Sequence, residues 1–556
     1  MFRKFKDKID IVTVIIAVAA LVFSFWLMFS TFSYKDGSIL IAAKARSDFG
    51  SHIPLIRSFS LGNNFPPEYP IFPGEPIRYH FLFYLLVGLI ERAGLRIDFA
   101  LVVPSALSFS FLIVIIYLLA KLVFKSRFVG ILSVIFFLFN GSLSFLEFFK
   151  AHPVSLNTPF EILKNTTFPS FGPYDGKIVS AFWNLNIFTN QMHLAPPLAL
   201  LLFLVYLLIK NEEKKVSLKW HSALLWGVFL GILPFSHSSI FIMALAILGI
   251  SFLLFKHQRV PLLLILALGV ILSLPRTLYL KDTAIFVPQI KLGYLITDNF
   301  NIKTFLTYWF MNFGLFFVFM PLGFLLSPKN GKKLFIAFLP LFVIGNLIQF
   351  SPEMASNHKF FNVFLIIGNM LTAYLIYKIW KAHSFTKVFV LPFVLIMTLS
   401  GVIDFFAIKN DGLGELPDYP NNPDIAWIME NTPKDTVFLN STYFFDAASL
   451  AGRKIFFGWP YFAWSVGHDT YKRDKITRTM LNPPDLPTLC ILLKENNIDY
   501  ISIINDRRSE DFEINFEFFK ENFLKIYENP RDNLVIYETL FSCKNALLSP
   551  SFSGGN

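Results

Sequence analysis

The chain alternates between long apolar runs and shorter polar connections, a pattern typical of a protein that crosses a membrane many times. A run of roughly 17–25 apolar residues can span a bilayer as a helix, and about eleven stretches reach or approach that length. They lie at about 11–32, 101–124, 128–147, 195–209, 219–236, 238–255, 260–276, 304–326, 333–350, 359–379 and 387–408. The stretch from Phe81 to Ile90 is too short to cross, so we expect a juxtamembrane or re-entrant helix there.

Basic residues predict the orientation of these crossings. Lys and Arg gather before residue 9 and in the connections after each even-numbered stretch, for example at Lys121, Lys125 and Arg127. Because cytoplasmic loops retain positive charge, the N-terminus is expected inside. The long connections at 33–100, 148–194 and 277–303, and everything beyond 409, then lie on the extracytoplasmic side of the cell membrane.

The predicted domains follow from a change in composition near residue 409. Residues 1–408 form a transmembrane domain, 409–423 a linker rich in Pro and Asn, and 546–556 a flexible tail. Residues 424–545 alternate between helical and strand-like runs, which favours a soluble α/β domain with a mainly parallel sheet. Helices are expected at Asp424–Glu430, Leu486–Asn496 and Phe516–Ile526, and strands at Thr436–Leu439, Arg453–Phe457, Ile498–Ile504 and Leu534–Tyr537.

Composition supports a polytopic α-helical membrane protein. The chain has 556 residues, of which 54% are hydrophobic and 16% charged, and a mean hydropathy of +0.55. A soluble domain carries roughly 25% charged residues. The net charge of +11 sits largely in short loops, so we expect no nucleic-acid partner. Cys490 and Cys543 either pair or stay free; the sequence leaves both open.

The first outer connection holds the leading candidate for catalysis. Asp48 and His52 are four residues apart and would share one face of a helix, where a carboxylate and an imidazole can act as a general base and its partner. Arg57, Arg78 and His80 follow and are candidates for binding phosphate. The alternative interpretation of Asp48 is a helix-capping residue in a solvated loop.

Other candidates border the same side of the membrane. His193 is a further candidate for catalysis, with an interfacial histidine as the alternative. Cationic and polar side chains at this depth suit a lipid-linked phosphate, and interfacial snorkelling is the alternative for the cations. The candidates for substrate binding here are Asn190, Gln191, His237, Arg276, His358 and Lys359. The aromatic residues Trp459, Tyr461, Phe462 and Trp464 are interpreted either as a sugar platform or as core packing.

Two classes of protein are disfavoured by what the sequence lacks. The predicted spans hold few ionisable residues beyond His221 and Asp404, whereas ion-driven transporters need titratable groups at mid-membrane. The soluble part has no GxGxxG or Walker motif, which disfavours binding of a dinucleotide or ATP. HExxH, paired CxxC and dense Asp clusters are missing as well, so no metal-ligating residue is predicted. No cofactor is certain, and a divalent metal is left as a possibility.

The arrangement of these segments resembles the GT-C superfamily of integral membrane glycosyltransferases. The resemblance rests on a first span, an outer loop with an early acid at Asp48, a juxtamembrane stretch at 78–86 and a span beginning near Pro104. The nearest in style are protein O-mannosyltransferases and lipid A aminoarabinose transferases. The resemblance covers roughly residues 1–210 in pattern and the whole chain in topology.

The resemblance implies a polyprenyl-phosphate-linked sugar donor, an acceptor that is a glycan, lipid or protein, contact with membrane lipid, and inversion at the anomeric carbon. Asp48 would deprotonate the acceptor hydroxyl. The chain departs from the mannosyltransferases, because Phe49 stands where they have the second acid of an Asp-Glu pair. It also lacks the Trp-Trp-Asp signature of oligosaccharyltransferases, which disfavours transfer to asparagine.

The sequence therefore predicts a membrane glycosyltransferase of the hexosyltransferase type, with Asp48 as base. Two alternatives stay open: a carrier or flippase for a lipid-linked solute, and a non-catalytic partner in polysaccharide assembly.

Overall fold

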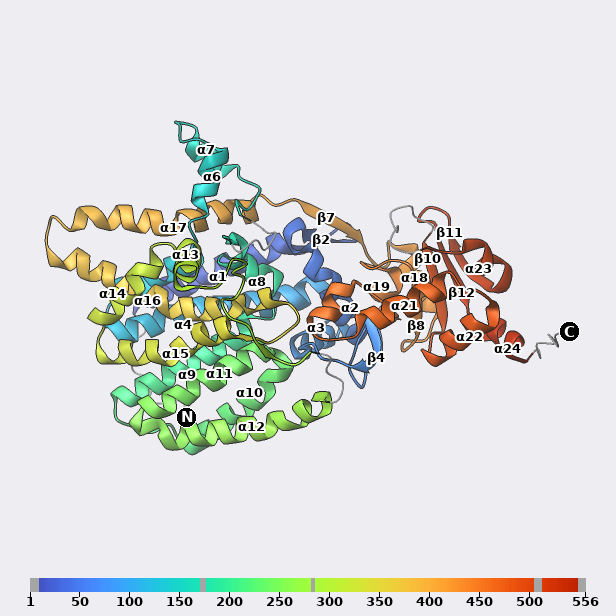
Figure 1. Ribbon diagram of the computed structural model, residues 1–556, viewed down its shortest axis with the longest axis horizontal. Coiled ribbons are helices and arrows are strands. Elements are labelled where there is room, and N and C mark those ends of the chain that lie inside the picture. Colours follow the sequence, from blue (N-terminus) through green and yellow to red (C-terminus); the bar gives the residue numbers. More distant parts are fainter. Residues whose placement is uncertain (1–9, 171–176, 282–285, 505–512, 549–556) are drawn as a thin grey trace.

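The computed structural model describes residues 10–170, 177–281, 286–504 and 513–548. It consists of a helical bundle and a C-terminal α/β domain at one end of that bundle (Figure 1). The basic start and most of the predicted tail at 546–556 lie outside the described residues.

Every predicted span carries at least one helix. Within the described residues, six helices are long and apolar enough to cross a membrane, or seven with one bent pair. The six are α1 (Ile11–Thr31), α4 (Ile97–Phe124), α9 (Ala195–Glu213), α12 (Arg259–Lys281), α16 (His358–Ala382) and α17 (Lys387–Lys409). In α16, 89% of the apolar window is buried, against 22% in α1, so α16 is the central helix of the bundle.

The remaining predicted spans are shorter or interrupted. The bent pair is α13 (Ile302–Phe313) and α14 (Phe316–Leu326), which meet at 89°. Three apolar helices of intermediate length are α5 (Arg127–Leu138), α10 (Trp220–Ser236) and α11 (Ser238–Leu254), and α15 spans Lys329–Leu347. The predicted continuous helix at 128–147 is wrong: α5 ends at Leu138, and the non-helical residues 139–144 separate it from α6 (Phe145–Ala151).

Short elements on one side of the bundle shape the first and second outer connections. The first connection forms α2 (Arg46–Ser60) and α3 (Leu82–Arg92), which pack on each other, and α3 is the expected short helix. The second forms α7 (Thr158–Leu163) and α8 (Asn186–Asn190). Strands β1 (Phe32–Lys35), β2 (Ser38–Ala42) and β7 (Leu413–Pro417) make an antiparallel sheet in the order β1-β2-β7. The predicted linker is therefore partly a strand held by the first connection.

The C-terminal domain is a five-stranded sheet flanked by helices. Its strand order is β11-β12-β10-β8-β9. The strands are β8 (Val437–Asn440), β9 (Lys454–Ile455), β10 (Tyr500–Ile504), β11 (Leu524–Asn529) and β12 (Leu534–Glu538). The helices are α18 (Pro423–Asn431), α19 (Ala447–Leu450), α20 (Pro460–Ser465), α21 (Thr470–Leu481), α22 (Leu486–Glu495), α23 (Phe516–Asn522) and α24 (Leu540–Leu548).

This sheet corrects two expectations. It is mixed rather than mainly parallel, because β8 pairs in parallel with β9 and β10, while β12 is antiparallel to β10 and β11. The predicted helix Phe516–Ile526 is too long, since α23 ends at Asn522 and β11 begins at Leu524. The alternation along the chain is a local property, whereas the direction of pairing depends on distant strands. Cys490 and Cys543 form a disulfide that joins α22 to α24.

The first outer connection attaches the α/β domain to the bundle. Strands β3 (Glu68–Tyr69) and β4 (Phe72–Pro76) lie beside β9, and the amide of Ile455 donates to the carbonyl of Pro70 at 2.8 Å. Lys454 pairs with Glu68 at 2.6 Å, and His468 with Glu75 at 2.9 Å. These contacts hold the α/β domain, which includes α20, against the first connection at one end of the bundle.

Candidate functional site

A cavity of about 630 Å³ lies between the outer connections, the start of α16 and α20. Ligand-binding cavities of about 300–1,000 Å³ are typical for small molecules. The first connection contributes polar side chains, the segment 350–359 leads into α16, and the α/β domain adds an aromatic wall. The predicted site residues that line the cavity are Asp48, His52, Arg78, His80, Asn190, Gln191, His358 and Lys359.

Asp48 lies in the first turn of α2, part-buried, with its side chain bordering the cavity. A carboxylate is favourable at the N-terminal end of a helix because it faces the positive end of the helix dipole. Burial raises the pKa of Asp48 to about 6, while the Lys359 ammonium and the Asn190 amide act in the opposite direction. Asp48 is thus partly protonated near pH 6 and largely ionised at pH 7.

Lys359 faces Asp48 from the first turn of α16. Asn357 precedes it and donates to the carbonyls of Gly345 and Ile348, which fixes the backbone where α16 begins. Lys44, the other lysine at the cavity, pairs with Asp411 at 2.8 Å. For Lys359, by contrast, no salt bridge forms within the described ranges. A part-buried cation without a bonded carboxylate is suited to binding an anion.

The histidines behind Asp48 form an aromatic cluster rather than a pair with it. His52 lines the cavity but is not hydrogen-bonded to Asp48; its Nε2 lies 3.4 Å from the Tyr79 hydroxyl. Burial lowers the pKa of His52 to about 3, so it is neutral at ordinary pH. His193 lies behind His80, with its Nε2 at 2.6 Å from that of His80 and its Nδ1 at 2.6 Å from the Tyr84 hydroxyl. Asp48 therefore has no histidine partner at this site, and His193 does not border the cavity. Glu353 is a second carboxylate among the described residues that line the cavity, and its side chain accepts from the backbone amide of Ala355.

The predicted arginines fall into two groups. Arg78 lines the cavity and donates to the carbonyl of Gly467, and Arg276 donates to the carbonyl of Arg78 at 2.8 Å. Arg57 requires a correction: it is buried in α2, where it pairs with Asp418 at 2.6 Å and Glu91 at 3.4 Å. Its terminal nitrogens face Glu91 of α3 and Asp418 of the linker, and Arg57 does not line the cavity.

Two polar groups in the second outer connection face the cavity with free acceptors. The side-chain oxygens of Asn190 and Gln191 are buried and lack hydrogen-bond partners within the part of the chain that the structure describes. A buried acceptor of this kind is costly unless a ligand supplies a donor. Hydroxyl groups of a sugar are such donors.

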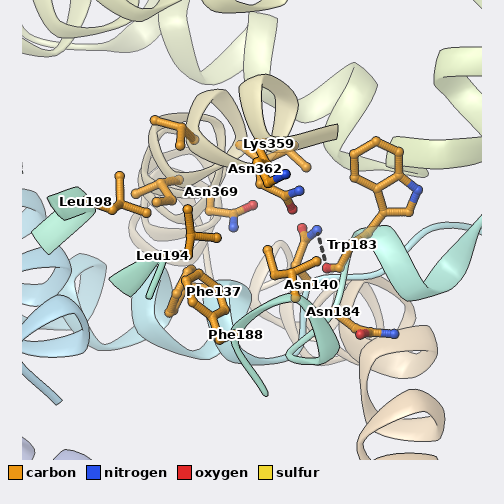
Figure 2. Close-up of a pocket in the computed structure, with 14 residues that line it drawn as sticks. Phe137, Asn140, Trp183, Asn184, Phe188, Leu194, Leu198, Lys359, Asn362 and Asn369 are labelled. Atoms are coloured by element: carbon orange, nitrogen blue, oxygen red, sulfur yellow. Dashed lines mark hydrogen bonds between the residues drawn. The ribbon is translucent and has the colours of Figure 1, made fainter. Parts of the chain in front are cut away.

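A second, much smaller pocket lies deeper in the bundle, on the inner side of Lys359 (Figure 2). Its volume of about 20 Å³ is enough for a single water molecule. Asn140, Asn362 and Asn369 point into it, and Asn140 donates to the carbonyl of Trp183 at 3.1 Å. These asparagines were missed by the sequence reasoning, which searched the spans only for ionisable residues. Polar amides within apolar runs are the signal that finds them.

The aromatic residues near α20 have two interpretations from the sequence, a platform for a sugar or packing in the core. Three of these aromatic residues line the cavity: Trp459, which directly precedes α20, and Tyr461 and Phe462 within α20. Trp464 does not line it. Tyr461 is 42% exposed, so part of its ring surface is available to a ligand.

No protein-family model matches the chain, and no curated protein does so significantly. Among solved structures, an Archaeoglobus fulgidus oligosaccharyltransferase tethered to an acceptor peptide is similar over 95% of this chain and 74% of that one, with 12% identity and a TM-score of 0.49.

Two further structures from the same organism give similar values. One is the archaeal oligosaccharyltransferase with an inhibitory peptide and a dolichol-phosphate, at 12% identity and a TM-score of 0.46 over 95% of this chain and 74% of that one. The other is the Archaeoglobus fulgidus oligosaccharyltransferase in complex with Zn and sulfate. It has 13% identity and a TM-score of 0.47, over 94% of this chain and 73% of that one. A likeness at these scores carries no argument about activity.

Proposed function

We propose that the protein is a membrane glycosyltransferase that moves a sugar from a polyprenyl-phosphate-linked donor to an acceptor hydroxyl on the extracytoplasmic side. The single observation that carries the proposal is that Asp48 and Lys359 face one cavity from different elements, at one end of an apolar bundle. One group accepts a proton and the other binds an anion, which are the two requirements of an inverting displacement.

The reaction uses these groups in one step. The Asp48 carboxylate takes the proton of the acceptor hydroxyl as its oxygen forms a bond to the anomeric carbon. The bond from that carbon to the phosphate oxygen breaks, and polyprenyl phosphate leaves with the electron pair. Lys359, with Arg78 at the same cavity, stabilises the negative charge that develops on the phosphate. Asn190 and Gln191 accept hydrogen bonds from hydroxyls of the sugar.

The same proposal includes a topology with eleven crossings, a cytoplasmic N-terminus and an extracytoplasmic α/β domain. A helix within each predicted apolar range supports it, as does the location of all cavity residues near one end of the bundle. The transmembrane domain, residues 1–408, then holds the base and the phosphate ligand. The α/β domain closes the cavity with its aromatic wall.

The test uses purified protein in nanodiscs with synthetic polyprenyl-phosphate sugars and a panel of glycan, lipid and peptide acceptors. Release of polyprenyl phosphate with formation of a glycosylated acceptor is the expected result. Asp48→Asn is expected to lower turnover by about 10²–10⁴, the usual contribution of a general base. Asp36→Asn, an exposed aspartate in the turn between β1 and β2, is the matched control and should retain full activity.

A parallel pair tests the phosphate ligand. Lys359→Met should weaken donor binding, whereas Lys381→Met, at the exposed end of the same helix, should not. Full activity in the Asp48→Asn protein refutes the proposal. Movement of the donor across the bilayer without transfer of its sugar would instead support a carrier.

A further inference from the structure

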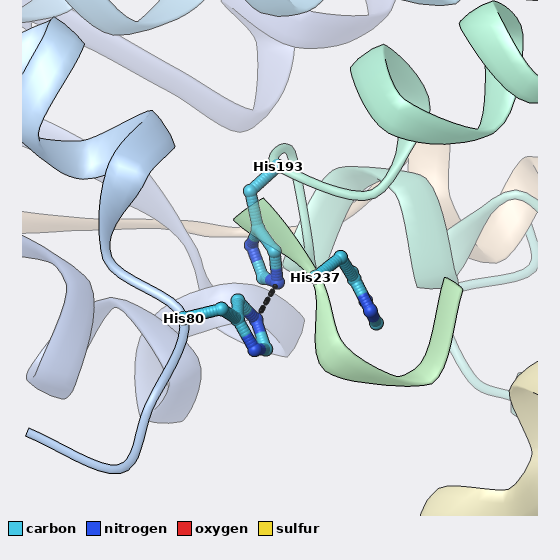
Figure 3. Close-up of side chains that lie close together, drawn as sticks. All are labelled: His80, His193 and His237. Atoms are coloured by element: carbon cyan, nitrogen blue, oxygen red, sulfur yellow. Dashed lines mark hydrogen bonds between the residues drawn. The ribbon is translucent and has the colours of Figure 1, made fainter. Parts of the chain in front are cut away.

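Three histidines from separate connections meet behind the cavity (Figure 3). His80 lies between β4 and α3, His193 between α8 and α9, and His237 between α10 and α11. Each offers one ring nitrogen, and these atoms all lie within 4.8 Å of one another. The three histidines are far apart in the sequence, so no metal-binding motif of fixed spacing indicates the cluster.

His237 is the residue whose environment most needs a ligand. It is fully buried, and neither of its ring nitrogens has a hydrogen-bond partner among the described residues. Its ring stacks on that of His80, with centroids 4.5 Å apart. A buried imidazole with both nitrogens unsatisfied is unfavourable unless a further group binds it.

His193 is held in the manner of a metal ligand. Its Nδ1 lies 2.6 Å from the Tyr84 hydroxyl, and this contact leaves Nε2 directed at His80. A hydrogen bond to the second ring nitrogen commonly fixes the orientation of a ligating histidine.

We propose that His80, His193 and His237 bind one divalent transition-metal ion of the zinc type. Neutral imidazoles favour Zn²⁺, Co²⁺, Ni²⁺ and Cu²⁺ over Mg²⁺ and Ca²⁺, which take oxygen ligands. Three protein ligands leave one position of a tetrahedral ion open, and His80 directs that position toward the cavity, since it alone of the three lines it.

The geometry needs small adjustments to accept the ion. Nitrogens bound to zinc at about 2.0–2.1 Å are about 3.3 Å apart in a tetrahedron. The His80 and His193 nitrogens, at 2.6 Å, must separate, and His237 must approach. Rotation of part-exposed His80 provides the first movement.

The charges around the cluster indicate what else binds. Lys359 faces all three histidines and Arg276 faces His80, so a bare cation is opposed by positive charge. An anion at the open position offsets that repulsion. That this anion is the phosphate of the donor rests on the proposed function; the metal site itself does not.

The experiment measures metal content and requires no sugar donor. Full-length protein in detergent is stripped with a chelator, reloaded with ZnCl₂, desalted and analysed for zinc by mass spectrometry. We expect one zinc per chain, and a Co²⁺-loaded sample with the visible absorption of a tetrahedral nitrogen site. His237→Ala and His80→Asn should each lower zinc affinity at least tenfold, while His221→Ala, an exposed histidine at the start of α10, should not.

Thermal melting identifies variants that fail to fold. If His237→Ala fails to fold, His80→Asn, at a part-exposed position, still tests the site. Failure of the wild-type protein to retain zinc overturns the proposal, as does equal retention by folded His237→Ala and His80→Asn. Loss of transferase activity in any variant bears on the proposed function alone.

Discussion

Replacing Asp48 by Asn should lower sugar transfer by about 10²–10⁴ while leaving the fold at least as stable. The structure provides the magnitude, because burial raises the Asp48 pKa from 3.8 to about 6. That difference corresponds to about 3 kcal/mol, at 1.36 kcal/mol per pH unit. The folded state holds the proton more tightly than the unfolded chain, so this contribution is present below pH 3.8 and is lost as the pH rises through about 6. At pH 7 the ionised Asp48 carboxylate therefore lowers the folding stability of the wild-type protein, whereas the neutral amide of the Asp48→Asn protein does not.

The same pKa predicts the pH dependence of the reaction. The base form of Asp48 is present above pH 6 and declines below it, so turnover should fall about tenfold per pH unit on the acid side. The positive charge of Lys359 lowers the Asp48 pKa, so Lys359→Met should raise that pKa. The fall in turnover at low pH, the acid limb of the pH profile, should then shift to higher pH. Asp446 also has a pKa raised to about 6 by burial, and it caps α19 in the other domain. Asp446→Asn should leave the limb in place.

The assay follows release of polyprenyl phosphate in nanodiscs between pH 4.5 and 8 at constant ionic strength, with thermal melting of the same samples. Two results would refute the reasoning. One is a lower melting temperature for Asp48→Asn than for wild type at pH 7, and the other is an acid limb that survives in the Asp48→Asn protein.

Three further outcomes follow from other contacts. Arg57→Met leaves two buried carboxylates unpaired and should lower the stability by about 3–5 kcal/mol, measured by thermal melting. Arg92→Met, on the exposed surface of α3, is the control and should not change the stability. An unchanged melting temperature of Arg57→Met together with a higher KM would indicate that Arg57 binds substrate. The Cys490–Cys543 disulfide closes a separation of 53 residues, so Cys490→Ser together with Cys543→Ser should lower stability by about 4 kcal/mol, and equal melting with and without reductant would contradict this. Trp459→Ala removes part of the aromatic wall and should raise the KM for the acceptor without moving the acid limb; an unchanged KM would assign Trp459 to packing alone.

Local patterns were sufficient for much of the bundle. The apolar ranges 11–32 and 387–408 match α1 and α17 closely, and the short stretch from Phe81 matches α3. The break after Leu138 and the bend between α13 and α14 were not anticipated, because hydropathy averaged over a window does not register a turn within it.

Residues whose partners are distant in sequence were harder to assign. In the sequence, Arg57 has no carboxylate partner nearby and is therefore a reasonable candidate for binding phosphate. Only the fold shows that Arg57 contacts Asp418, which is 361 positions away. The three-histidine cluster was missed for the same reason, since His80 and His193 are 113 positions apart.

The sequence by itself determined that the chain is a membrane protein, where its helices form and that Asp48 lies in the connection that follows the first span, because the transfer of apolar segments into lipid is a sum over neighbouring residues. Only the tertiary structure decided that Asp48 faces Lys359, that α20 closes the cavity, and which histidines meet behind it. Those relations depend on distances between segments, and packing of helices and strands from remote parts of the chain sets such distances.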